Sequence, residues 1–304
     1  MYAFLIPAKI IWFNTFIVKI LSGFYRVSII FATEMVEMKK VVFCFLIVLY
    51  ACNDNHKAAE PASSVTEQPN EEKRLRDAIA QHPDSLLLRE NLVQYFRDNG
   101  NYFNAIKEVD QVLRKDSLNA RLWDIKAVLE FEDADTANAI RSFERAIAIF
   151  PAPEYIVSLG TLYAQTKDPQ ALIMADALLN DKKADAEKEG LFIKGLYHSF
   201  KNEKATAIIF FDKCLALNYT FMDAYREKAI ALYDLGKYTE ALAVLDKAIT
   251  LQNNFDEGYY YSGRCLEKLN RIPEAIQSYQ NALIYDPEYV EAKDALARLK
   301  ASSK

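Results

Sequence analysis

The residue types that most often do chemistry in proteins are sparse in this chain of 304 residues. Its three histidines, His56, His82 and His198, are far apart, and the chain contains no HExxH, GxSxG or CxxC pattern and no glycine-rich phosphate loop. The sequence therefore predicts no catalytic residue, no metal ligand and no cofactor, and we expect that the protein is not an enzyme.

One acidic stretch has some of the character of a metal site. Glu132-Asp133-Ala134-Asp135 resembles the start of a calcium-binding loop. It lacks the glycine and the distal glutamate that such a loop requires. The simpler interpretation is a solvated turn between two helices.

Charge and cysteine content exclude further classes. The chain has 37 basic and 42 acidic residues, and residues 52–304 alone have 32 basic against 40 acidic. This acidic balance disfavours nucleic acid as a partner, because phosphate binding needs a basic surface. Cys214 and Cys265 lie at positions that predict buried thiols in separate units, which disfavours a disulfide between them.

A period of 34 residues organises most of the chain. Alanine stands at positions that are one or two periods apart: Ala105, Ala139, Ala207, Ala241 and Ala275. Twelve residues earlier stands a glycine or another mostly small residue: Val93, Ala127, Gly195, Ala229 and Gly263. Four residues later stands a large apolar residue: Val109, Phe143, Phe211, Leu245 and Tyr279. A fixed period of this length indicates a repeat array.

The pattern resembles the tetratricopeptide repeat, in which each unit is a pair of antiparallel helices. The best match is 256–289, with Tyr259, Gly263, Ala275, Tyr279 and Pro287 at pattern positions. The resemblance implies an all-α fold, an α-solenoid of stacked helix pairs over residues 71–303. We expect half a repeat first and a closing helix within 290–303 last. Between them we expect six repeats: 86–119, 120–153, 154–187, 188–221, 222–255 and 256–289.

The third unit departs from the pattern. Ala171 stands two residues early, and no large residue follows four positions later. We expect a short second helix near 170–180, followed by a longer loop over 181–187 or a local change in the angle between units.

Residues before the repeats resemble a bacterial lipoprotein signal. Met38-Lys39-Lys40 precedes an apolar run at 41–50 and then Ala51-Cys52, which predicts a signal peptide at 38–51 and lipidation of Cys52. Residues 52–70 then form a polar tether that lacks helical periodicity. Residues 1–37 are interpreted as an over-extended gene start; the alternative is a genuine membrane anchor. The resemblance favours the outer membrane, facing the periplasm.

In tetratricopeptide arrays the first helix of each unit lines a concave binding groove. Carried over by register, that resemblance assigns an apolar, aromatic centre and a basic end to a partner-binding groove made of Val157, Phe192, Phe200, Arg226, Tyr233, Tyr260, Arg264 and Lys268. Leu196 and Ile230 fit either the groove or the core. The lysine–asparagine clamp of chaperone-binding members is absent, since Glu90, Gln94 and Ile230 stand at its positions.

The sequence thus predicts a membrane-anchored interaction scaffold of the bacterial cell envelope that binds a segment of another envelope protein in this groove. The alternatives are a non-catalytic subunit of an envelope enzyme or nutrient-uptake complex, and a homo-oligomer formed through the aromatic residues. Ser85, Ser117 and Thr136 each follow an aspartate in a pattern that resembles a bacterial O-glycosylation motif. The competing interpretation is that they are ordinary helix caps.

Overall fold

The computed structural model describes residues 68–180 and 184–302. The predictions for residues 1–37, the signal peptide at 38–51, the lipidated Cys52 and most of the tether lie outside the described residues. The described chain is entirely helical and divides into two compact units that meet in sequence between Ser142 and Phe143.

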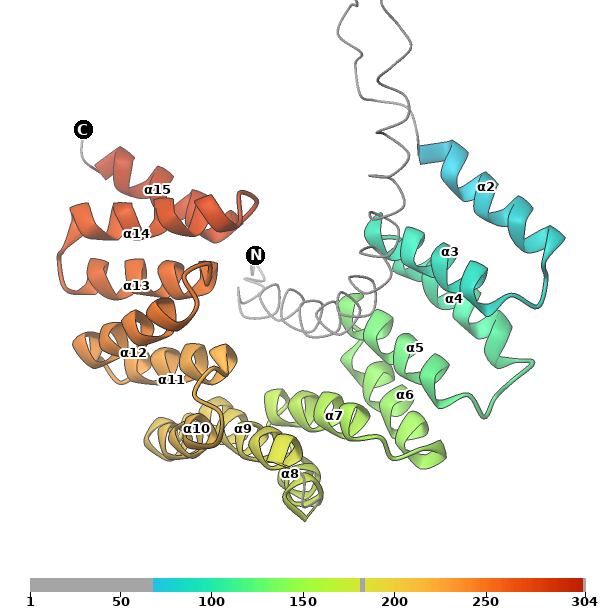
Figure 1. The fold of residues 1–304 in the computed structure, drawn as a ribbon, viewed down its shortest axis with the longest axis horizontal. Coiled ribbons are helices and arrows are strands. Elements are labelled where there is room, and N and C mark those ends of the chain that lie inside the picture. Colours follow the sequence, from blue (N-terminus) through green and yellow to red (C-terminus); the bar gives the residue numbers. More distant parts are fainter. Residues whose placement is uncertain (1–67, 181–183, 303–304) are drawn as a thin grey trace, which may run out of the picture. The chain divides into compact units, whose positions relative to one another are not determined.

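The helices follow one another in antiparallel pairs (Figure 1). Unit 1 contains α2 (Gln68–Gln81), α3 (Leu86–Asp98), α4 (Tyr102–Leu113), α5 (Ala120–Glu132) and the first half of α6 (Thr136–Ile149). Unit 2 contains the rest of α6 and α7 (Pro153–Gln165), α8 (Gln170–Asn180), α9 (Ala184–Phe200), α10 (Lys204–Leu217), α11 (Met222–Asp234), α12 (Tyr238–Leu251), α13 (Asp256–Lys268), α14 (Ile272–Tyr285) and α15 (Val290–Ser302). The all-α array of helix pairs, with a leading half pair and a closing helix, is confirmed.

Side-chain caps begin several of these helices. Ser85 Oγ accepts a hydrogen bond from the Leu88 backbone N–H at 3.4 Å, and Asn119 Oδ1 accepts one from the Leu122 backbone N–H at 3.3 Å. Asp135 Oδ1 caps the start of α6 in the same way through the Asn138 backbone N–H at 3.1 Å. Each cap satisfies a backbone donor that the helix cannot. The caps support the helix-start interpretation at Asp84-Ser85 and at Asp135-Thr136, where Asp135 supplies the capping oxygen, but at α5 the cap is Asn119 and not Ser117.

A left-handed residue turns the chain between the two helices of each pair. These residues have positive φ and recur every 34 positions, with the third one position early: Gly100, Ala134, Lys167, Asn202, Gly236 and Asn270. Glycine adopts this conformation without strain. Ala134, at φ 63°, places the calcium-like stretch in such a turn between α5 and α6, as the simpler interpretation predicted.

The third pair differs from the others, and one expectation about it was wrong. Helix α8 is short, at 11 residues, as predicted. The longer loop expected through residue 187 does not form, because α9 already begins at Ala184 and runs for 17 residues. The alanines Ala171 and Ala175 are fully buried on α8, so α9 lies close enough that a Cβ on Gly190 would stand 2.7 Å from the Ala175 carbonyl oxygen. The small side chains of Ala171, Ala175 and Gly190 thus permit α8 and α9 to pack closely.

Helix α2 begins at Gln68, three residues inside the segment expected to be a tether.

Cys214 and Cys265 are free and buried, as predicted, and burial raises the pKa of each thiol to about 12. Within residues 68–180 and 184–302, no helix combines the length and apolar character that crossing a membrane requires.

Candidate functional site

The first helices of the pairs in unit 2 form a continuous face. Helix α7 contacts α9, α9 contacts α11, and α11 contacts α13. An ion pair between Arg298 and Glu267 joins α15 to α13. We call this surface, lined by α7, α9, α11, α13 and α15, the first-helix face. All eight residues predicted to bind a partner lie on these helices.

The aromatic and apolar residues predicted for the centre of the groove are buried or half-buried. Phe192 is only 2% exposed, and its ring lies 5.9 Å from that of Phe211 and 5.0 Å from that of Phe221. Phe200 and Val157 are half-buried. The expectation that Phe192 presents its ring to a partner is corrected: the ring belongs to the core, because Phe221 of the following turn covers it. Leu196, at 1% exposure, is also core.

Arg226 does not contribute a basic surface either. Its side chain is 2% exposed and is held by three carboxylates. Nη1 donates to Asp223 at 2.7 Å and to Glu257 at 2.8 Å, and Nε donates to Glu227 at 3.2 Å. Burial opposes the charge, but these carboxylates hold the pKa of the guanidinium above its usual value. Arg226 is therefore an internal link between α11 and α13.

The remaining predicted residues come together in one cleft at the C-terminal end of unit 2. The cleft measures about 510 Å³ and lies among α11, α13, α14 and α15. Tyr233, Tyr260, Arg264 and Lys268, all predicted from the sequence, line it together with Glu267, Tyr279, Glu291, Asp294, Ala295 and Arg298. The structure thus keeps four of the eight predicted residues at one site.

Arg264 is the centre of this cleft. Its guanidinium carbon lies 4.7 Å from the ring centroid of Tyr233, 5.9 Å from that of Tyr260 and 5.4 Å from that of Tyr261. Such stacking stabilises a cation electrostatically while leaving its N–H groups to bond elsewhere. Among the described residues, no carboxylate forms an ion pair with Arg264. The cleft therefore holds a half-buried cation whose preferred partner, a carboxylate, is missing.

Glu267 is fully engaged within the protein. Arg298 donates to both of its oxygens at 2.7 Å, and the Tyr279 hydroxyl donates to Oε1 at 2.5 Å. Burial alone would raise the pKa of this carboxyl, but the hydrogen bonds from Arg298 and Tyr279 outweigh it and lower the pKa. The Glu267–Arg298 pair is thus a structural contact that fixes α15 against α13.

The sequence-based groove omitted the residues that α15 brings to the cleft. A signal for them exists: if the 34-residue register continues past 289, then Glu291, Asp294 and Arg298 occupy the second, fifth and ninth positions of the next unit. Those are the groove positions that the resemblance implies for the first helix of each unit. The closing helix thus acts as one more first helix.

In unit 1, the charged residues on the first helices pair with each other. Arg97 forms a two-pronged ion pair with the buried Glu132, and Arg121 Nη2 donates to Glu90 at 3.1 Å. Each pair joins α3 to α5, so these four charges offset one another. The pairing also engages Glu132, which the calcium-like stretch would have needed as a ligand, and no metal-binding cluster occurs in the described part of the chain.

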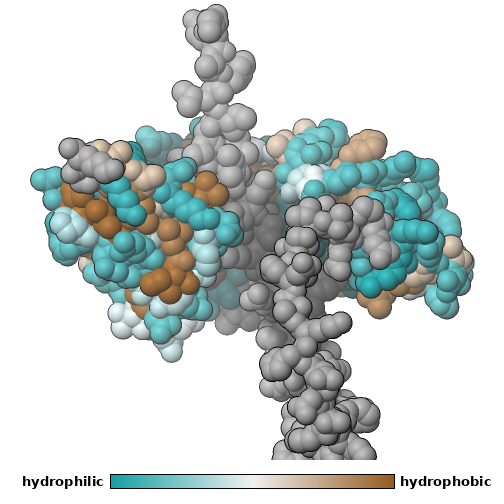
Figure 2. Space-filling model, turned by 90° about the horizontal axis from the view of Figure 1, so that it is seen from above, coloured by the Kyte–Doolittle hydropathy of each residue, from teal (hydrophilic) through white to brown (hydrophobic). Residues whose placement is uncertain are grey.

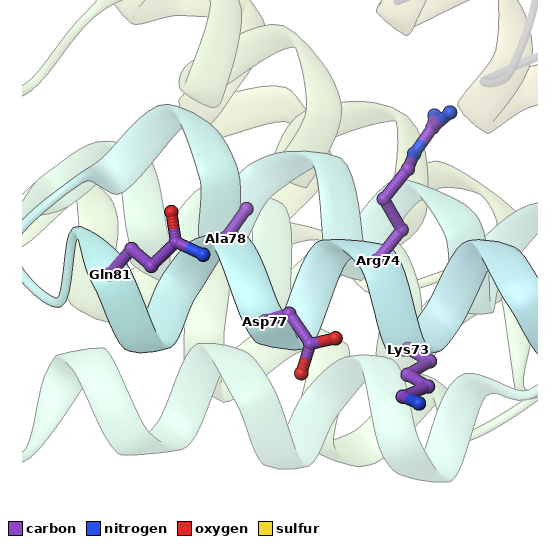
Figure 3. A pocket seen from close by; sticks show the side chains of 5 residues that line it. All are labelled: Lys73, Arg74, Asp77, Ala78 and Gln81. Atoms are coloured by element: carbon purple, nitrogen blue, oxygen red, sulfur yellow. The ribbon is translucent and has the colours of Figure 1, made fainter.

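A second hollow, of about 380 Å³, lies along α2 (Figure 3). Its lining comes from one helix only: Lys73, Arg74, Asp77, Ala78 and Gln81. Figure 3 shows that these side chains point in different directions. Because they do not converge on a common point, the hollow lacks the arrangement of a binding site.

Hydrophobic residues also reach the surface away from the cleft. Figure 2 shows patches of them on a largely hydrophilic exterior. Leu217, Leu251 and Tyr285 occupy equivalent positions at the ends of three successive second helices and are 41–47% exposed. Scattered exposed apolar residues are normal on protein surfaces, so these three side chains do not by themselves indicate a binding site.

Comparison with known proteins agrees with this geometry. Residues 90–153, 211–254 and 226–290 match the family model of the tetratricopeptide repeat. A TPR repeat-containing protein of Methanocaldococcus jannaschii is 27% identical over 214 residues, covering 66% of this chain and 36% of that protein. The wheat (Triticum aestivum) Hsp70-Hsp90 organizing protein is 27% identical over 161 residues, covering 53% of this chain and 26% of that protein. The chain thus spans about a third or less of these relatives.

A solved structure shows the same fold. The crystal structure of a tetratricopeptide repeat protein from Parabacteroides merdae has a TM-score of 0.63 and 18% identity, covering 77% of this chain and 92% of that one. Stacked helix pairs with a face of first helices define an all-α repeat fold. By its repeat pattern, by its family match over residues 90–153 and 211–290 and by its fold, the chain contains tetratricopeptide repeats.

Proposed function

We propose that the protein is a membrane-anchored interaction scaffold of the bacterial cell envelope, and that it holds a segment of a partner protein in the C-terminal cleft of unit 2. The observation that carries the binding proposal is Arg264, stacked on three tyrosine rings at the cleft without a carboxylate of its own. Tyrosine and arginine are the residue types that dominate binding energy at protein interfaces.

The anchoring part of the proposal rests on the sequence. A basic start, an apolar run and Ala51-Cys52 support lipidation at Cys52, and 15 residues separate that cysteine from α2. A flexible chain of this length spans on the order of 20 Å, which is enough to hold the repeats away from a bilayer. Two acyl chains suffice for stable attachment.

A chaperone, which the name of the wheat relative suggests, is not the partner we propose. Glu90, Gln94 and Ile230 stand where the resemblance to a chaperone-binding clamp needs lysine and asparagine, and Glu90 pairs with Arg121. The half-buried cation on which the binding proposal rests is Arg264, toward the other end of the sequence.

The binding proposal is tested by partner capture from detergent-solubilised membranes with the full chain. Tyr233→Ala combined with Arg264→Ala should weaken capture by about 2 kcal/mol, a roughly thirtyfold lower affinity. Leu251→Ala, exposed outside the cleft, is the control and should capture normally. Helical content by circular dichroism must match the wild type. Equal capture by all three proteins would remove the cleft from the proposal.

The anchoring proposal is tested separately by intact mass of the native protein and by Cys52→Ser. We expect a diacylated product that begins at Cys52 and a variant that is released from the membrane fraction. A native product that retains residues 2–37 would contradict lipidation at this cysteine.

A further inference from the structure

Apart from the paired Glu267 and Arg298, four charged residues line the cleft, and their positive and negative charges lie on opposite sides. Arg264 and Lys268 lie on α13, whereas Glu291 and Asp294 lie on α15. Glu267 and Arg298, which also line the cleft, neutralise each other. Among the described residues, none of the four remaining charges belongs to an ion pair. The cleft therefore has a positive wall and a negative wall.

The two walls do not satisfy each other. Ion pairs form within 4.0 Å elsewhere on these helices, as in the contacts of Arg298 with Glu267 and of Lys293 with Glu288. None crosses the cleft from Arg264 or Lys268 to Glu291 or Asp294. Arg264 is half-buried against the tyrosine rings, and a partly desolvated cation without a carboxylate is unfavourable. A ligand that supplies a carboxylate there removes that cost.

The opposite wall sets a second requirement. A ligand that carries only carboxylates would place negative charge beside Glu291 and Asp294, and like charges repel strongly where water is partly excluded. A ligand with a basic group on that side turns the repulsion into attraction. Between the walls, the half-buried Tyr260 offers apolar ring surface, and its ring packs on the buried Tyr279 behind it.

Resting on the proposed function, we propose that the cleft binds a peptide segment that carries one acidic and one basic side chain, with the carboxylate on Arg264 and the basic group on Glu291 and Asp294. Side chains four residues apart on a helix lie on one face, with Cβ atoms about 6 Å apart. A helical segment with charges of opposite sign one turn apart can therefore present both groups to the cleft at once.

The test uses the full chain in detergent and three sets of acetylated, amidated twelve-residue peptides of equal apolar content. One set carries glutamate and lysine four residues apart, one carries two glutamates, and one carries two lysines. We expect the mixed set to bind at least tenfold more tightly than either single-sign set, measured by fluorescence anisotropy.

Charge-reversal variants then test which wall binds which charge of the peptide. Arg264→Glu should shift the preference toward the two-lysine peptides, and Glu291→Lys should shift it toward the two-glutamate peptides, each by tenfold or more. Lys293→Glu, on α15 outside the cleft lining, is the matched control and should leave the order unchanged. Circular dichroism and thermal melting verify that each variant is folded.

The outcomes separate this inference from the function on which it rests. The two-wall inference would be overturned if peptides of a single sign bound as tightly as the mixed set, or if the charge reversals left the order of affinities unchanged. The proposed function would still stand in either case, provided that the cleft binds peptide. If no set binds and partner capture is also insensitive to Tyr233 and Arg264, both fail. Self-association through the cleft, seen by light scattering and abolished by Arg264→Glu, would replace the peptide with a second copy of the chain and overturn the inference.

Discussion

At Gly195 and Gly263, the ring of an aromatic residue from the second helix fills the space that a Cβ would need. A Cβ on Gly195 would stand 2.4 Å from Phe211 Cε1, and one on Gly263 would stand 2.6 Å from Tyr279 Cε1. In the pair between them, Ala229 and Leu245 occupy the same two positions. A bulky ring is thus matched by glycine and a smaller aliphatic side chain by alanine.

Gly263→Ala should therefore destabilise the protein by about 1–3 kcal/mol, because overpacking opposes the close approach of α13 and α14. The sign is informative, since the same change in an open helix stabilises by about 1 kcal/mol. Adding Tyr279→Leu should recover part of the loss in a double-mutant cycle measured by urea unfolding, after the cost of the lost Tyr279–Glu267 hydrogen bond is counted. Strictly additive effects would contradict the steric explanation.

At the scale of elements, neighbouring pairs are joined by charged side chains that reach from one first helix to the next. Arg97 with Glu132, Arg226 with Glu257 and Arg298 with Glu267 each connect residues 31 to 35 positions apart. Only the Arg226 contact is fully enclosed, with two more carboxylates beside it. Its loss would leave the buried Glu257 and the half-buried Asp223 and Glu227 without the guanidinium that links them.

Arg226→Met should destabilise unit 2 by about 3–5 kcal/mol at neutral pH. Burial already raises the pKa of the Glu227 carboxyl against the attraction of Arg226, so removing this cation should raise that pKa further. The variant then regains stability as the pH falls through that raised pKa, because the folded state takes up protons first. Urea midpoints between pH 7 and pH 5 measure this. A deficit that is the same at both pH values would show that shape alone, and not charge, matters at this position.

At the scale of the whole molecule, helix pairs that contact mainly their sequence neighbours make stability a sum of local terms. Helix α15 closes the array by covering a cluster that includes Leu266, Tyr279 and Ala282 with its own Ala292, Leu296 and Leu299. Its outer side carries exposed polar residues such as Lys293 and Lys300. The last pair therefore depends on α15 for burial, while distant pairs do not.

Deleting residues 290–304 should lower the hydrogen-exchange protection of α13 and α14 by tenfold or more, and leave α3 to α5 unchanged. The same deletion should abolish binding in the cleft, since one wall is lost. Mass-spectrometric hydrogen exchange compares the two regions within one sample. A uniform loss of protection along the chain would contradict the local account of stability.

The sequence by itself determined the helix pairs, their period and the closing helix. The reason is local: which residues let two adjacent helices approach depends on small and large side chains at set spacings within one unit. Even the left-handed turns keep the 34-residue register, except where the third unit is one residue short of it. Of the eight residues predicted to line a partner-binding groove, four line the cleft that we propose as the binding site.

Only the tertiary structure decided which residues remain accessible among those that occupy the same position in successive repeats. Phe192, Arg226 and Tyr260 stand 34 residues apart on α9, α11 and α13. Phe221 covers Phe192, and Glu257 pairs with Arg226, whereas Tyr260 lines the cleft beneath α15. A repeat pattern specifies the same place in each unit, but exposure and charge at that place depend on the side chains that the next unit presents.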